Sequence, residues 1–215
     1  MGQALSRGRF IALEGGEGAG KSSQAAMLAD ALRQTGLAVI RTREPGGAQG
    51  AEEIRGLLVE GSPERWDPET EALLVVAARR NHLVETIWPA LNRGEWVISD
   101  RFADSTTAYQ GYGRGLPQQA LKSLHEFIAG DFKPDLTIIL DLPVNTGLSR
   151  ASRRRGQETR FESMDREFHE RVRQGFLDIA RQEPKRCLVI DATGTIDAVH
   201  QAIRAAVRAR LGVAF

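Results

Sequence analysis

The sequence is short of several features that would indicate particular classes of protein. Among its 215 residues there is one cysteine, Cys187, so no disulfide can form within the chain and no cysteine cluster can hold a metal. No apolar run approaches the roughly 18 residues of a membrane-spanning helix. The net charge is +1, which gives no overall attraction to nucleic acid or to a membrane surface. These deficits favour a protein of a reducing cytoplasm that binds neither nucleic acid nor membrane.

What is present is typical of a globular α/β protein. Hydrophobic residues make up 41% and charged residues 27% of the chain, and the length favours a single domain over 1–215. Apolar strand-like runs alternate with amphipathic helical runs, which predicts a five-stranded parallel sheet with helices on both faces. The expected strands are 9–13, 37–40, 96–98, 136–142 and 187–190. The expected helices are 22–34, 51–60, 68–91, 117–128, 144–155, 167–182 and 196–211.

The most informative stretch lies between the first strand and the first helix and fits the phosphate-loop pattern G-x-x-x-x-G-K-S. It consists of Gly15, Gly16, Glu17, Gly18, Ala19, Gly20, Lys21 and Ser22, followed by Ser23. Its glycines allow successive backbone N–H groups to turn towards a polyphosphate, and the helix that follows adds a partial positive charge. The lysine would reach the β- and γ-phosphates of a nucleotide, and the Ser22 hydroxyl would hold Mg²⁺. The stretch therefore predicts an ATP-binding site with bound Mg²⁺.

Three further features distinguish a kinase from the other classes of phosphate-loop protein, and two of them are absences or substitutions. The chain has no Asn-Lys-x-Asp motif, which argues against a GTPase switch. The third strand ends in Asp100-Arg101, and an arginine cannot accept a proton from water as a hydrolase requires.

An arginine-dense segment follows the fourth strand and would form a mobile lid over about 150–162. It contains Arg150, Arg153, Arg154, Arg155 and Arg160, with Gly156 as a hinge. Guanidinium groups bind phosphate oxygens bidentately, and a closing lid excludes water from the transfer.

The acceptor should present a second phosphate near this loop. Candidate cations on the facing loops are Arg55, Arg79 and Arg101, while Tyr109 and Gln110 could contact a sugar and a base edge. Each has an ordinary structural alternative, such as a surface ion pair or a core aromatic. Residue types and spacing alone therefore indicate a small-molecule or nucleotide kinase and go no further.

Several separated motifs together resemble the bacterial thymidylate kinase family over essentially the whole chain. They are 14–22, Thr-Arg-Glu-Pro-Gly-Gly at 42–47, Ala-Ala-Arg at 77–79, Asp-Arg-Phe at 100–102, Ala-Tyr-Gln-Gly at 108–111, Gly-Arg-Gly at 113–115 and 130–143. The resemblance implies a P-loop kinase fold and transfer of the ATP γ-phosphate to dTMP with Mg²⁺. It also implies a homodimer packed through helices.

The resemblance also implies roles for individual residues. Lys21, Arg101, Arg153, Arg155 and Arg160 would be catalytic, the last three as lid arginines on the ATP phosphates, and Arg150 would lie beside the adenine near 191–194. The dTMP residues would be Glu17, Glu44, Pro45, Arg55, Arg79, Arg101, Thr106, Tyr109 and Gln110. Among these, Glu17 would approach the 3′-hydroxyl, and Arg55 and Arg101 would hold the phosphate. The thymine edge would be contacted by Arg79, Thr106 and Gln110. Tyr109 would pack under the deoxyribose. Glu44-Pro45 would form a bend, often with a cis peptide. Ser22 and Asp100 would be the metal site.

The chain departs from the family pattern at two positions. The phenylalanine that usually stacks on thymine is replaced by Val75, and Thr159 stands where an acid often precedes the last lid arginine. The alternatives that stay open are a kinase of another nucleoside monophosphate or small alcohol, and a nucleotide switch without turnover.

Overall fold

The structure is a computed structural model that describes residues 7–153 and 160–215. Its centre is a parallel sheet of order β2-β3-β1-β4-β5. The strands are β1 (Phe10–Gly15), β2 (Val39–Arg43), β3 (Trp96–Asp100), β4 (Leu136–Asp141) and β5 (Cys187–Asp191). The predicted α/β class and the parallel sheet are confirmed. The central β1 is buried throughout and apolar up to Glu14 because it is covered on both faces, as expected for a parallel sheet.

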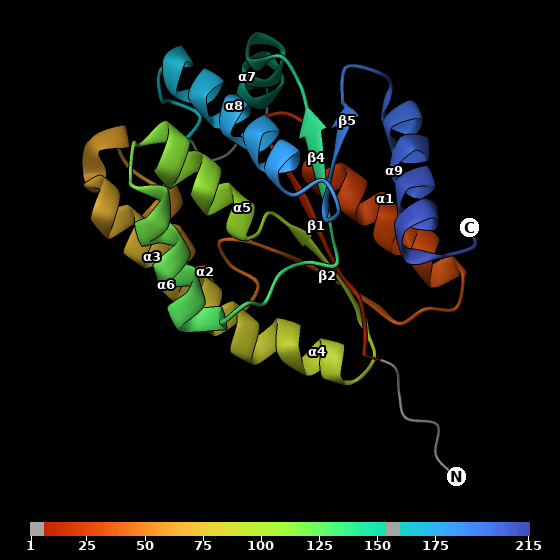
Figure 1. Ribbon diagram of the computed structural model, residues 1–215. Coiled ribbons are helices and arrows are strands. Elements are labelled where there is room, and N and C mark those ends of the chain that lie inside the picture. Colours follow the sequence, from red (N-terminus) through yellow and green to blue (C-terminus); the bar gives the residue numbers. More distant parts are fainter. Residues whose placement is uncertain (1–6, 154–159) are drawn as a thin grey trace.

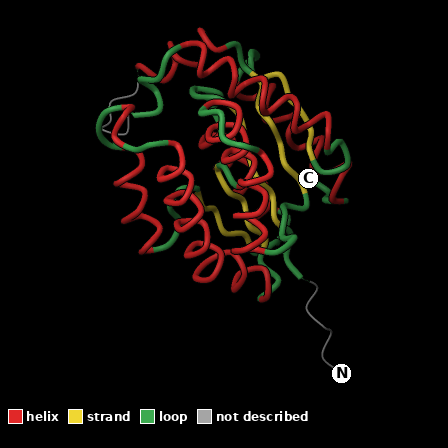
Figure 2. The backbone as a smooth tube through the Cα atoms, turned by 60° about the vertical axis from the view of Figure 1, so that its left-hand side comes forward, coloured by secondary structure: helices red, strands yellow, loops and turns green. Residues whose placement is uncertain are grey.

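Helices cover both faces of the sheet (Figures 1 and 2). One face carries α1 (Lys21–Gln34) and α9 (Ile196–Leu211), which pack on each other and on the strands. The other face carries α4 (Trp88–Asn92), α5 (Ala103–Thr106) and α8 (Arg166–Gln182). Farther from the sheet on that side lie α2 (Gln49–Val59), α3 (Pro68–His82) and α6 (Gln118–Ala129). The described chain also contains η1 (Pro63–Arg65) and α7 (Val144–Ser152), and two π-helical segments that are described below.

The predicted helix over 68–91 is interrupted by a π-helical segment, η2 (Leu83–Ile87). Pro89 follows it at the start of α4 and has no N–H to donate to the preceding turn. A wider turn accommodates the proline without ending the helix. Helical periodicity alone therefore predicted the length of this segment but not its change of pitch.

The segment 104–115, for which no helix was predicted, folds as α5 and a second π-helical segment, η3 (Thr107–Gly113). Its glycine-rich composition hides the helical signal. The π geometry matters for the site because two consecutive residues, Tyr109 and Gln110, both line the same pocket. Such π-helical turns are frequent at functional sites.

The register of the sheet brings the ends of distant strands together. Leu13 of β1 pairs with Asp100 of β3, and Gly15 pairs with Leu140 of β4. The loops that follow these strands therefore meet at one edge, where parallel α/β sheets bind ligands. None of the helices in the described ranges has both the length and the apolar composition needed to cross a bilayer.

Candidate active site

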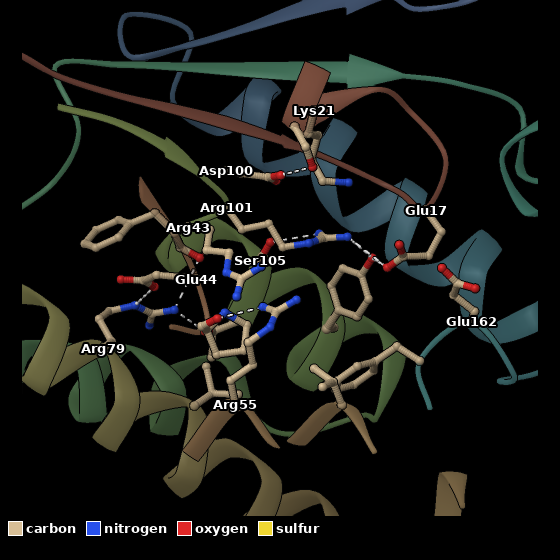
Figure 3. Close-up of a pocket in the computed structure, with 18 of the residues that line it drawn as sticks. Glu17, Lys21, Arg43, Glu44, Arg55, Arg79, Asp100, Arg101, Ser105 and Glu162 are labelled. Atoms are coloured by element: carbon tan, nitrogen blue, oxygen red, sulfur yellow. Dashed lines mark hydrogen bonds and ion pairs between the residues drawn. The ribbon is translucent and has the colours of Figure 1, made fainter. Parts of the chain in front are cut away.

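A pocket of about 280 Å³ lies at the carboxyl edge of β1 and β3 (Figure 3). All the residues predicted for the acceptor line it, namely Glu17, Glu44, Pro45, Arg55, Arg79, Arg101, Thr106, Tyr109 and Gln110. The same pocket is lined by Gly18, Gly20, Lys21, Ser22 and Asp100 from the predicted donor side. The predicted donor and acceptor groups thus share one cavity, as a direct transfer between two bound molecules requires.

The phosphate loop has the backbone that its glycines permit. Gly15, Gly18 and Gly20 all have positive φ, at 134°, 68° and 90°. A side chain at Gly18 would place its Cβ 2.0 Å from the carbonyl oxygen of Gly147, so the loop packs directly on α7. Glycine is therefore required at this position by both backbone conformation and space.

Lys21 begins α1 and folds back over the loop, where its Nζ donates to the carbonyl of Gly16 at 2.7 Å. Burial lowers the pKa of Lys21 to about 8, and the charge of Arg101 acts in the same direction, against the acids Glu17 and Asp100. A desolvated ammonium in this position is poorly hydrated and has much to gain from a phosphate oxygen.

Ser22 and Asp100 come together although they lie in different βα units. The Ser22 hydroxyl donates to Oδ2 of Asp100. A hydroxyl and a carboxylate side by side at a phosphate loop are oxygen ligands of the kind Mg²⁺ prefers when it also binds nucleotide phosphates. No cluster of three or more acidic, histidine or cysteine side chains that could hold a metal by itself is found in the part of the chain that the structure describes. The pair therefore fits a metal that arrives with its nucleotide.

Arg101 is the centre of the site. It follows β3 with a φ of 72°, a left-handed conformation that is unusual for a residue with a side chain. Its Nη1 donates to the carbonyl of Gly15 at 3.0 Å and to Ser105 Oγ at 3.1 Å. Its Nη2 donates to Glu17 and to the hydroxyl of Tyr109, both at 2.8 Å. Backbone strain concentrated at one pocket residue is typical of a functional position.

Glu17 is the acidic partner within the phosphate loop. Its Oε1 accepts from Arg101 and from the Tyr109 hydroxyl at 2.7 Å. Burial acts to raise the pKa of Glu17, but the charges of Arg101 and Lys21 outweigh it, and the pKa falls to about 2. Glu17 is therefore a carboxylate at any physiological pH and can only accept hydrogen bonds.

The Glu17 ion pair predicts a pH-dependent contribution to stability. Because the folded-state pKa of about 2 lies below the ordinary 4.5, the contribution is complete above pH 4.5 and is lost as the pH falls towards 2. We expect the wild type to exceed Glu17→Gln by at most about 3 kcal/mol in unfolding free energy at pH 6, and by much less at pH 3. Urea unfolding at both pH values measures this, with the exposed Glu53→Gln as control. An equal difference at the two pH values would contradict the assignment.

The loop after β2 supplies a second ion pair beneath the pocket. Arg79 is 2% exposed and donates from Nε to Glu44 at 2.7 Å and from Nη2 to Thr106 Oγ1 at 2.8 Å. Glu44 also contacts His82 Nδ1 at 3.0 Å, and the Glu44-Pro45 peptide is cis. Burial acts to raise the pKa of Glu44, but Arg79 and His82 lower it overall. The pair holds Arg79 with its guanidinium edge at the pocket.

The predicted lid arginines lie in different surroundings. Arg150 of α7 donates to the carbonyl of Ala192 at 3.4 Å, which joins α7 to the loop after β5. Arg153 is exposed at the end of α7, and Arg155 lies outside the described residues.

Arg160, predicted to contact the ATP phosphates, lies outside the pocket in the structure. This arginine is fully buried and forms an ion pair with Glu71 at 2.6 Å. Its Nε and Nη1 donate to the carbonyls of Ser62 and Leu58, both at 3.1 Å. With its nitrogens engaged by these acceptors, the side chain anchors the chain after the lid. The sequence reasoning gave Arg160 the same role as the neighbouring arginines because all lie in one arginine-dense segment. Its backbone acceptors are about a hundred residues away in the sequence.

Two buried acids were missed by the sequence reasoning. Glu14 at the end of β1 accepts from the backbone N–H of Phe102 at 2.8 Å and from Ser105 Oγ at 2.6 Å, so it holds the turn that carries Arg101. Burial, aided by the charge of Asp104, raises the pKa of Glu14 to about 7. Glu71 of α3 is likewise fully buried. The available signal for Glu14 was an acid at the end of an otherwise apolar strand.

Known proteins resemble this chain in both sequence and structure. The family model described as thymidylate kinase matches residues 13–203. A thymidylate kinase of Caulobacter vibrioides is 54% identical over 97% of this chain and all of its own length, and one of Magnetococcus marinus is 49% identical over the same shares. The crystal structure of a thymidylate kinase from Ehrlichia chaffeensis superposes with a TM-score of 0.76 at 36% identity, covering 94% of this chain and 99% of its own.

Proposed function

The chain belongs to the thymidylate kinase family and transfers the γ-phosphate of ATP to dTMP to give dTDP, and we propose that the pocket between the phosphate loop and α3 is where the transfer occurs. One observation carries the proposal. The Arg101 guanidinium lies in the same pocket as Lys21 and Ser22, and also as the base-edge candidates Thr106 and Gln110. A single cation can then contact an acceptor phosphate at the point where the donor phosphate arrives.

The reaction is an in-line displacement. An oxygen of the dTMP phosphate attacks the γ-phosphorus, a P–O bond forms, and the bond to the β-phosphate oxygen breaks to release ADP. Little covalent help is needed, so the protein contributes alignment and positive charge. Lys21 would bind the β- and γ-phosphates, while Arg55 and Arg101 would hold the acceptor phosphate. Mg²⁺ held by Ser22 and Asp100 would neutralise charge on the β- and γ-oxygens.

The sugar and base of dTMP would lie on the opposite side of the pocket from Lys21. Arg79 and Thr106 share a hydrogen bond at 2.8 Å and together offer donors and an acceptor to the base edge, with Gln110 next to them. Tyr109 is 5% exposed and would pack beneath the deoxyribose, where a 2′-hydroxyl would clash. Glu17 is already paired with the Tyr109 hydroxyl and would accept from the 3′-hydroxyl.

A substrate panel tests the proposed acceptor. A coupled assay of ADP release with dTMP, dUMP, CMP, AMP and GMP should show a clear preference for dTMP, because the predicted base and sugar contacts suit a deoxypyrimidine. A preference for another monophosphate would favour a kinase of that nucleotide. Binding of ATP without any diphosphate product would favour a nucleotide switch. Omission of Mg²⁺ should abolish turnover in the same assay.

The segment about 150–162 is proposed to act as a lid that brings arginines to the ATP phosphates. Arg153 is exposed at the end of α7 and is the described candidate, with Arg155 beyond the described residues. We expect Arg153→Ala to lower kcat more than it changes the KM for dTMP, because a lid arginine acts on the transferred group. Steady-state kinetics with both substrates varied measures this. A rise in the KM for dTMP alone would make Arg153 an acceptor ligand.

A homodimer packed through helices is also proposed. Large apolar side chains are exposed on α2, α3, η2 and α6. They are Leu57 at 39%, Leu73 at 55%, Val84 at 41% and Phe127 at 89%. Leu73 and Val84 lie about three helical turns apart on one continuous helical segment, so they share a stripe. An exposed apolar stripe of this kind suits a second copy of the chain.

Charge placed in this stripe should dissociate the dimer. We expect Leu73→Arg to convert the protein to a monomer in sedimentation velocity experiments at micromolar concentration, because a guanidinium would be desolvated in the interface. Ile196→Arg is the matched control, since Ile196 is 53% exposed but lies on α9, on the opposite face of the sheet. A wild-type protein that is already monomeric would refute this part of the proposal.

A cytoplasmic location is proposed as well. The buried thiol of Cys187 is unpaired, which suits a reducing compartment where ATP is supplied.

A further inference from the structure

A buried carboxylate lies behind the part of the pocket assigned to the nucleobase. Glu71 of α3 is 0% exposed and does not itself line the pocket. Its Oε1 accepts from Nε2 of Gln110 at 2.9 Å, and its Oε2 accepts from Arg114 at 3.0 Å and from Arg160 at 2.6 Å. Of these partners, Gln110 lines the pocket, so Glu71 connects a pocket side chain to two cations outside it.

The two arginines hold the carboxylate in place. Nη2 of Arg114 and Nη2 of Arg160 both donate to the carbonyl of Pro63, at 2.8 and 3.0 Å. Arg160 also donates to the carbonyls of Ser62 and Leu58. Leu58 is in the last turn of α2, and Ser62 and Pro63 lie between α2 and α3, so the guanidinium groups are fixed by backbone atoms. A buried carboxylate between two such groups has little freedom to move.

The fixed carboxylate decides which way the amide of Gln110 is turned. Both oxygens of Glu71 accept from cationic or amide N–H groups, so the Gln110 atom that faces it is the NH₂ group. The amide oxygen of Gln110 is then the group turned away from Glu71. Gln110 is only 2% exposed and lines the pocket next to Thr106 and Arg79, so this oxygen is the amide group that is left for the base edge.

A hydrogen-bond acceptor at this place distinguishes pyrimidines by their N3 atom. Thymine and uracil carry an N3–H that donates to such an oxygen. Cytosine has an unprotonated N3, whose lone pair would face the lone pairs of the amide oxygen. A pocket built to accept from a substrate N–H rejects an analogue that lacks it, because its own buried polar group is left unpaired.

We propose that Glu71, held by Arg114 and Arg160, is a positioning residue that fixes the amide of Gln110 so that its oxygen accepts from the N3–H of the pyrimidine and excludes cytosine. The proposal rests on the assignment of the nucleobase to the side of the pocket lined by Gln110. It also gives Arg160 a role in acceptor selection.

The direct test is Glu71→Gln, which keeps the shape of the side chain but offers both a donor and an acceptor to Gln110. The Gln110 amide can then invert. We expect the ratio of kcat/KM for dTMP to that for dCMP to fall at least about tenfold. The ratio for dTMP to dUMP should not change, because both bases carry N3–H, and the KM for ATP should stay the same. Glu53→Gln, an exposed change on α2, is the matched control and should alter neither ratio.

A second variant keeps the test decisive if the loss of a buried charge prevents folding. Gln110→Leu removes the proposed acceptor without touching the ion pairs and should lower the dTMP to dCMP ratio by a similar factor. In that background, Glu71→Gln should have no further effect on the ratio wherever the double variant folds. An unchanged ratio in Gln110→Leu, or in a folded Glu71→Gln protein, overturns the inference. A wild-type enzyme that does not prefer dTMP in the substrate panel would instead refute the acceptor assignment itself.

Discussion

Replacing Arg101 with alanine is expected to lower kcat/KM for dTMP by on the order of a hundredfold or more. The guanidinium lies between the phosphate loop and the acceptor side of the pocket, with hydrogen bonds to Gly15, Ser105, Glu17 and Tyr109. In the reaction it would contact phosphate oxygens whose charge changes during transfer, so its loss affects the transition state more than the ground state. Steady-state kinetics with dTMP and ATP each varied measures the effect.

The effect on catalysis must be distinguished from an effect on folding, because Arg101→Ala leaves Glu17 without its ionic partner. Alanine introduces no new backbone strain at φ 72°, since arginine already has a Cβ there. Arg101→Lys is the informative comparison. It keeps a charge but not the planar fork, so we expect an intermediate rate with stability closer to wild type. Activity of Arg101→Ala within tenfold of wild type, in a protein whose thermal unfolding is cooperative, would remove Arg101 from the mechanism.

Replacing Lys21 with methionine is expected to be at least as damaging to turnover as the loss of Arg101. Lys21 Nζ lies over the phosphate loop, 2.7 Å from the carbonyl oxygen of Gly16, where the β- and γ-phosphates would bind. Methionine preserves most of the length and the apolar stem, so the change removes mainly the charge. We expect kcat to fall by on the order of a hundredfold to a thousandfold, with a higher KM for ATP.

The free energy of unfolding provides a separate readout for Lys21, because removing its charge is expected to lower activity without lowering stability. The folded-state pKa of about 8 lies below the ordinary 10.5, so the charged form is disfavoured by folding below pH 8 and this cost is relieved as the pH rises to 10.5. Lys21→Met should therefore be no less stable than wild type at pH 7 while being inactive. Lys122→Met on α6, an exposed lysine with an i,i+4 partner, is the control and should keep full activity. A variant that is both unfolded and inactive would show a structural role instead.

Much of the fold could be predicted from the sequence because its signals are local. The apolar runs of β1 and β4, the periodic helices and the glycine-rich loop each depend on neighbours a few residues away. Errors occurred where local signals conflict. Glycines masked the helical character of Thr107–Gly113, and a proline inside a periodic pattern concealed the π-helical turn at Leu83–Ile87. Edge strand β2 extends further than its apolar core predicted, because pairing with β3 carries the polar residues up to Arg43.

The candidate site was predictable to the extent that motifs specify residue types at the ends of strands. The structure brings the predicted acceptor residues into one pocket with the phosphate loop. It also shows roles that the sequence reasoning did not assign, such as those of Glu14 beneath the Arg101 turn and Glu71 behind Gln110. Both are buried acids whose partners come from other elements, so their roles depend on contacts that the sequence does not display.

By itself the sequence determined the phosphate loop, the order of strands and helices, and the membership of the chain in a kinase family. Only the tertiary structure decided what each arginine does. The sequence predicted a phosphate contact for both Arg101 and Arg160. One is turned into the pocket against Glu17, and the other is buried against Glu71 and backbone carbonyls. An arginine binds the acceptors that the fold places around it. The acidic partner of Arg101, Glu17, lies 84 residues away in the sequence, and the carbonyls around Arg160 lie 97 to 102 residues away.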